Sequence, residues 1–136
     1  MIEKAISALL SSYEELALQV GTRIYPSKRP QDSVRPALTF NRESGGTRDQ
    51  TYTGPSGLAA PVFRICVWTA DQPGGNLQAA EIAELIRKRL DGFHGYVAGV
   101  QIHRIALNDD PNIYDDVSEA YERAMDFRVW HAEARA

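Results

Sequence analysis

The stretch Val62-Phe63-Arg64-Ile65-Cys66-Val67-Trp68 decides the fold class of this chain. It is rich in β-branched and aromatic residues, which fit the pleated surface of a sheet. Successive side chains of a strand point to opposite faces, so Phe63, Ile65 and Val67 share one face. The pattern predicts that Leu58 to Thr69 contains the central strand of a β-sheet. The other face of this strand carries Val62, Arg64, Cys66 and Trp68.

The same alternation recurs toward the C-terminus, where Ser118 to His131 predicts a second long strand. Its inward set is Tyr121, Met125, Phe127 and Val129, and its outward set is Asp126, Arg128 and Trp130. Shorter apolar alternations predict strands from Pro36 to Arg42 and from Val97 to Leu107, with a brief extended piece ending at Pro26.

Two segments show the spacing of three and four residues that marks an amphipathic helix, Ile2 to Leu18 and Asn76 to about Leu90. Gly21 and Gly92 follow them as helix ends. The order α-β-β-α-β-β predicts an α+β fold with an antiparallel or mixed β-sheet and two helices packed on one face. A length of 136 residues fits one domain covering 1–136.

The segment Glu43 to Gly57 is polar and rich in glycine, and it reads as a long loop. Loops of this length in a compact domain tend to be functional or disordered, and the alternative here is a flexible connector without a role. We expect an assembly loop that orders on docking, in which charged and aromatic side chains make the contacts. The residues expected to do so are Arg42, Arg48, Asp49 and Tyr52.

Composition narrows the classes of protein to consider. The chain is 43% hydrophobic and 24% charged, with a net charge of −3 and mixed signs along the sequence. The single cysteine, Cys66, excludes an internal disulfide and a multi-cysteine metal site. There is no membrane-length apolar run, no secretory signal and no basic stripe. We therefore expect a protein made in the cytoplasm that binds neither membranes nor specific nucleic acid.

Catalytic patterns are missing from the sequence. His94, His103 and His131 are scattered without metal-ligand spacing, and Ser56 lies in Gly-Pro-Ser-Gly, which is not a nucleophile elbow. The sequence therefore predicts no enzyme, no metal and no cofactor. A hydrolase that uses Cys66 or one of the histidines is the alternative from the enzyme class.

Several short motifs, in order, resemble the siphophage tail completion (tail terminator) family, which also occurs in phage-derived gene transfer agents. The N-terminal half carries Gly21-x-Arg23-Ile24-Tyr25-Pro26, Pro36-Ala37-Leu38, Arg48-Asp49, Gly54-Pro55-Ser56-Gly57-Leu58 and Val67-Trp68. The C-terminal half carries Leu90-Asp91-Gly92, Tyr114-Asp115-Asp116, Tyr121-Glu122-Arg123 and Asp126-Phe127-Arg128-Val129-Trp130-His131. The resemblance covers nearly the whole chain.

This resemblance implies a structural protein of the virion tail without catalytic residues. Members of the family form rings, commonly hexamers, at the head-proximal end of the tail. The implied partners are further copies of the chain, the tail tube protein, and the head connector or stopper protein. A small α+β ligand-binding or regulatory domain without catalysis is the alternative outside assembly.

Two sets of residues are candidates for contacts within such an assembly. Exposed tryptophans beside arginines are typical of protein interfaces, so we expect a subunit interface formed by Arg64, Trp68, Asp126, Arg128 and Trp130. The alternative is that the helices cover this face. The segment Asn108 to Asp116 reads as an acidic turn, and a solvated turn without a further role explains it most simply. Clustered acids in a ring would repel passing DNA, and the candidates for the bore are Asp109, Asp110, Asp115 and Asp116.

Overall fold

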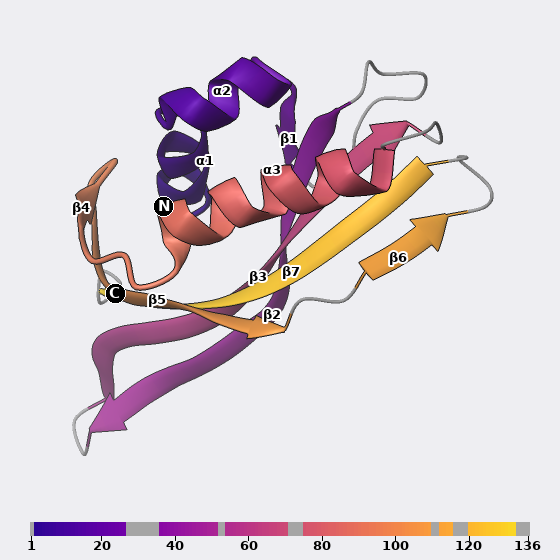
Figure 1. Ribbon diagram of the computed structural model, residues 1–136. Coiled ribbons are helices and arrows are strands. Elements are labelled where there is room, and N and C mark those ends of the chain that lie inside the picture. The colour runs from indigo at the N-terminus through magenta and orange to yellow at the C-terminus, as the bar shows by residue number, and fades with distance from the viewer. Residues whose placement is uncertain are drawn as a thin grey trace.

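The computed structural model describes residues 2–26, 36–51, 54–70, 75–109, 112–115 and 120–132. Within these residues, three helices lie on one side of a curled seven-stranded sheet (Figure 1). The helices are α1 (Ile2–Ser11), α2 (Glu14–Val20) and α3 (Gly75–Leu90). The strands are β1 (Ile24–Pro26), β2 (Ala37–Thr51), β3 (Gly54–Ala70), β4 (Gly95–Val97), β5 (Val100–Asp109), β6 (Asn112–Asp115) and β7 (Ala120–Ala132).

The strand order is β1-β2-β3-β7-β5-β4, and β6 pairs with the part of β7 that β5 leaves open. Only the β1–β2 pair is parallel among the described strands, so the sheet is mixed. The two strands predicted to be longest, β3 and β7, are neighbours at its centre, where Phe63 lies opposite Phe127. The predicted α+β class with helices on one face of a mixed sheet is confirmed.

The predicted element order needs correction at the N-terminus, where the single expected helix is two helices. The side-chain hydroxyls of Ser11 and Ser12 donate to the carbonyls of Ala8 and Leu9, local bonds that compete with continuation of the helix. Tyr13 then takes an extended conformation (φ −84°, ψ 105°) and precedes α2. The chain changes direction there, so α2 can bury Leu16 in the same core as α1.

Further along the chain, the predicted Val97–Leu107 strand is a small hairpin of β4 and β5. Ala98 and Gly99 both have positive φ, 48° and 82°, as a two-residue type I′ turn requires. The predicted acidic turn from Asn108 to Asp116 includes β6, which extends the sheet beside β7.

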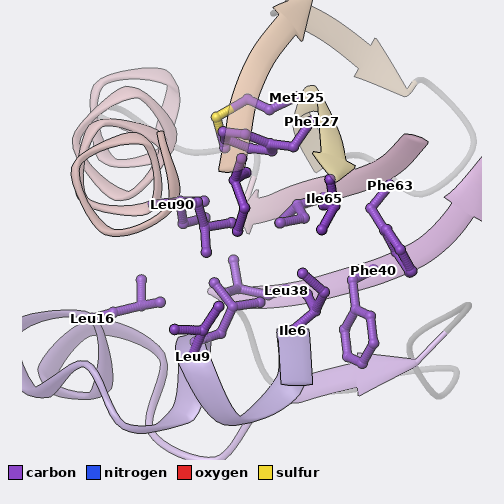
Figure 2. Packing of buried hydrophobic residues seen from close by; sticks show 14 of the residues in the cluster. Ile6, Leu9, Leu16, Leu38, Phe40, Phe63, Ile65, Leu90, Met125 and Phe127 are labelled. Atoms are coloured by element: carbon purple, nitrogen blue, oxygen red, sulfur yellow. The ribbon is translucent and has the colours of Figure 1, made fainter. Parts of the chain in front are cut away.

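The core lies between the helical layer and the sheet, as Figure 2 shows for side chains of α1, α2, α3, β2, β3 and β7 pointing toward one another. Phe63 and Phe127 are its largest fully buried side chains. The inward face predicted for β3 is confirmed, because Phe63, Ile65 and Val67 are all completely buried. In β7, Met125 and Phe127 are buried as predicted, as is Val129.

The prediction of a loop from Glu43 to Gly57 was wrong. β2 continues to Thr51 and β3 begins at Gly54, so the segment forms the end of a long β-hairpin that extends beyond the helical layer (Figure 1). The pairing register shifts between Ser44 and Thr47, where Gly45 and Gly46 lie. Glycines tolerate such bulges, and backbone pairing needs no apolar side chains. Tyr52 lies outside the described residues.

Candidate assembly surface

The sheet face opposite the helices, called here the outer face, carries every residue predicted for the subunit interface. The alternation of β3 and β7 places these side chains away from the buried set. In Figure 1 the described helices all lie on the other side of the sheet. The alternative that helices cover this face is therefore wrong for the described part of the chain. The five residues are Arg64, Trp68, Asp126, Arg128 and Trp130.

Arg64 and Asp126 bind each other across the centre of the outer face. They occupy directly opposite positions on β3 and β7. Arg64 Nε donates to Asp126 Oδ1 at 2.8 Å, and Arg64 Nη2 donates to Asp126 Oδ2 at 3.1 Å. Two parallel bonds fix both planar groups. This pair therefore ties two strands of one chain together.

Trp68 is also held within the chain. Its indole Nε1 donates to Thr39 Oγ1 on β2 at 3.0 Å, so the ring lies half-buried over the neighbouring strand. Cys66 lies in the next outward position of β3 and is buried between Thr39 and Ala124. Thr39, Cys66 and Ala124 thus form a cross-strand row of small side chains on the outer face.

Trp130 differs from Trp68 because it remains open to solvent, with 36% of its surface exposed. The guanidinium of Arg104, from β5, lies 5.7 Å from its ring centroid, within cation–π range. Arg128 lies two residues before it on β7 and donates through Nη1 to the Ala60 carbonyl at 3.0 Å. We call the surface formed by Arg104, Arg128 and Trp130 the Trp130 patch.

Arg104 was missed by sequence reasoning because β5 does not alternate regularly. The register between β5 and β7 shifts between Ile102 and Arg104, so His103 and Arg104 are both exposed while Ile102 and Ile105 are buried. A simple period-two reading cannot locate such a bulge.

Arg42, predicted for the assembly loop, instead points to the helical side. Its Nη2 donates to Glu3 Oε2 on α1 at 3.3 Å, and its guanidinium lies 5.7 Å from the Phe63 ring centroid. It therefore joins α1 to the sheet. Arg48 and Asp49 belong to β2, where Arg48 lies opposite Ala59 at the hairpin.

The acids predicted for the bore are only partly within the described residues. Asp109 ends β5 opposite Asp126, and Asp115 ends β6 opposite Ala120. Asp110 and Asp116 lie outside the described residues. The structure therefore places the backbone of Asp109 in the sheet, opposite Asp126, and not in a turn.

A hollow opens between α1 and the β1 edge of the sheet. Glu3 and Arg42, which line it, bind each other, so much of its charge is neutralised internally. The lining consists of Glu3, Lys4, Ser7, Pro26, Phe40, Asn41 and Arg42.

Side chains that could bind a metal or act in catalysis are dispersed over the described residues. In that part of the chain, no three His, Cys, Asp or Glu residues come together as a metal site would require. The direct cross-strand neighbours of Cys66 are Thr39 and Ala124, and neither residue type acts as a general base. Within the part of the chain that the structure describes, these groups are not brought into a catalytic arrangement. None of the described helices is long and apolar enough to cross a membrane.

A small α+β subunit with a helix-free sheet face, an exposed tryptophan between arginines and a projecting hairpin has the features of an assembly protein. The family model described as tail completion protein gp17 matches residues 4–132. The chain therefore belongs to the tail completion protein family, whose members are structural proteins of the virion tail.

Solved structures show the same fold at low sequence identity. A chain in a structure titled "Virion of native gene transfer agent (GTA) particle" is 19% identical, with a TM-score of 0.76, and the match covers 96% of this chain and 94% of that one. A second solved chain is 11% identical with a TM-score of 0.69, covering 99% and 96%. No curated protein sequence matches this chain.

Proposed function

We propose that the chain is a tail terminator. Several copies, six in the arrangement common to the family, form a ring that caps the head-proximal end of the tail tube. The ring joins the tube to the head connector or stopper protein. The family match over residues 4–132 and the fold shared with a chain of a gene transfer agent virion support this role.

The observation that carries the proposal is the Trp130 patch. A large aromatic ring is left one-third exposed beside two arginines on a sheet face that no described helix covers. Tryptophan and arginine dominate the binding energy of protein interfaces. A subunit that binds further copies of itself or other tail proteins is expected to expose such a surface.

The remaining features have roles consistent with a structural protein. The β2–β3 hairpin extends beyond the helical layer and supplies an edge for contact with the tube or the connector. Asp109, Asp110, Asp115 and Asp116 face the bore, where they repel the DNA that passes through. The chain performs no catalysis, and its partners are proteins.

The experiment is complementation of particles that lack this chain. Without it, heads and tails should accumulate separately, and added purified protein should restore joined particles that can be counted by electron microscopy. A gold-labelled chain should appear at the head-proximal end of the tail. Joined particles in the absence of the chain, or a label at the opposite tail end, would refute the proposal.

A further inference from the structure

The helical side of the molecule carries a second exposed surface that no described contact explains. Leu18 on α2 is 83% exposed, the highest value among the large hydrophobic residues of the described chain. Glu14 and Glu15, four and three residues earlier, are exposed and lie on the same side of the helix as Leu18. We call Glu14, Glu15 and Leu18 the α2 patch. It combines an apolar centre with two negative charges.

The two patches are complementary in chemistry. The Trp130 patch offers an aromatic ring flanked by Arg104 and Arg128, and the α2 patch offers a leucine flanked by two carboxylates. The sequence of α2, Glu-Glu-Leu-Ala-Leu-Gln-Val, contains no basic residue. Arg89 of α3 lies over the ring of Tyr13, whose hydroxyl donates to Glu15, but Arg89 donates its own hydrogen bonds to Leu9 and Ser12. Opposite charges around an apolar contact favour this pairing and disfavour pairing of either patch with itself.

The patches also lie on opposite faces of the molecule. The α2 patch belongs to the helical layer, and the Trp130 patch belongs to the outer face of the sheet (Figure 1). They cannot meet within one chain. When two different surfaces of identical subunits bind each other, the contact is heterologous, and repetition of a heterologous contact closes a ring when the rotation permits.

We propose that the Trp130 patch of one copy binds the α2 patch of the next copy, so that the same heterologous contact repeats around the ring. This contact rests on the proposed function, because it identifies which surfaces join neighbouring subunits in the ring. Trp130 packs on Leu18, and Arg104 pairs with Glu14 across the joint.

The choice of α2 over α3 follows from the charges on each helix. Glu84, exposed on α3, is bound by Arg87, whose Nε donates to it at 3.0 Å, and this hydrogen bond lowers the pKa of the Glu84 carboxyl. Lys88 is exposed one turn further along and would repel an arginine patch. α2 has neither feature.

Charge exchange tests which surfaces touch. Arg104→Glu and Glu14→Arg should each lower the self-association constant at least tenfold, measured by sedimentation at high concentration. An equal mixture of the two variants should regain association, since every second joint then carries the reversed pair. Glu81→Arg, the same charge change on the exposed side of α3, is the matched control and should have no effect. Melting curves show that each variant is folded.

Alanine substitutions test whether the contact between subunits is heterologous. Trp130→Ala and Leu18→Ala each remove one half of the joint, so a mixture of the two should stop at heterodimers. Wild-type protein that remains monomeric at millimolar concentration, unaffected association of Arg104→Glu, or failure of the mixed charge variants to recover overturns the inference. Duplex-DNA binding by wild type that is lost in Arg104→Glu also overturns the inference, because the Trp130 patch would then bind nucleic acid.

Tail joining is scored separately on the same variants. If the complementation assay succeeds with wild type and with both charge variants, the terminator role stands and this contact is wrong. If the variants associate as expected but wild type does not join heads to tails, the contact stands and the proposed function fails.

Discussion

Arg64 and Asp126 face each other on β3 and β7 and share two hydrogen bonds, at 2.8 Å and 3.1 Å. The side chains are 33% and 14% exposed, so solvent screens part of their attraction. Both were predicted as interface residues. Because each partner lies within the chain, we expect their first effect to be on the stability of the subunit.

A double-mutant cycle of Arg64→Ala and Asp126→Ala should give a coupling energy of about 1 kcal/mol in urea unfolding. Each single variant should be destabilised by more than this coupling, since it leaves one charge of a partly buried pair behind. Asp126→Asn is a milder control that keeps the shape of the side chain. Additive effects of the two alanine substitutions would show that the pair contributes nothing.

Trp130 and Trp68 should separate assembly from stability. Trp130→Ala should lower the free energy of unfolding of the monomer by less than the ~3–5 kcal/mol typical of a core tryptophan, because its ring is partly exposed, yet weaken association by about 2 kcal/mol or more. Tyr96→Ala, which removes a more exposed ring from β4, is the control and should leave both quantities unchanged.

Trp68→Phe should act in the opposite way. The substitution removes the indole nitrogen that donates to Thr39, leaving the hydroxyl of this buried residue without its donor. We expect a loss of about 1 kcal/mol in unfolding free energy and little change in association. Equal effects of the Trp68 and Trp130 substitutions on association would contradict the distinction between them.

Arg42 is expected to stabilise the subunit through α1. Arg42→Ala removes both the ion pair with Glu3 and the contact with the Phe63 ring, and should cost about 1–2 kcal/mol. Arg42→Lys keeps the charge but loses the planar group, so it should fall between alanine and wild type. Thermal melting measures both, and a wild-type melting temperature for Arg42→Ala would refute this role.

The β2–β3 hairpin allows a test that spares the core. Replacing residues 49–58 with Asn-Gly would join Arg48 and Ala59, which already lie opposite each other, through a two-residue turn. The described core cluster contains no residue between Phe40 and Phe63, so folding should be retained. Head–tail joining should be lost. Normal joining by the shortened protein would show that the hairpin tip makes no essential contact.

The sequence predicted the fold correctly where one face of an element is buried, because burial imposes a regular spacing of apolar residues. The alternation of Phe63, Ile65 and Val67 predicted the central strand and its inward face correctly, because one face is fully buried. The hairpin beyond Arg42 was missed because its polar, glycine-rich sequence lacks the apolar alternation that marks a strand. The break at Ser12 was missed because the apolar spacing runs through it.

The residues of the candidate surface were likewise predicted where the strands alternate regularly and missed where they do not. The outward positions of β3 and β7 were assigned correctly from parity, whereas the bulge near Arg104 concealed that residue. Whether an outward side chain is already bound within the chain depends on its distance to a neighbouring strand. Thr39 beside Trp68 and Asp126 beside Arg64 could be identified only once the strand order and register were known.

Duplex DNA is expected not to bind the chain at physiological salt. The net charge is −3, and at about 0.15 M salt screening beyond roughly 8 Å weakens isolated positive groups. On the outer face, Arg64 is bound to Asp126. The contact proposed between neighbouring subunits would cover Arg104 and Arg128. In the proposed ring, every phosphate contact would slow the passage of the genome, so strong phosphate contacts are not expected. A gel-shift titration of wild type against a short duplex should therefore show no complex at micromolar protein. A salt-dependent shift in that range would contradict this expectation and indicate that the protein handles DNA directly.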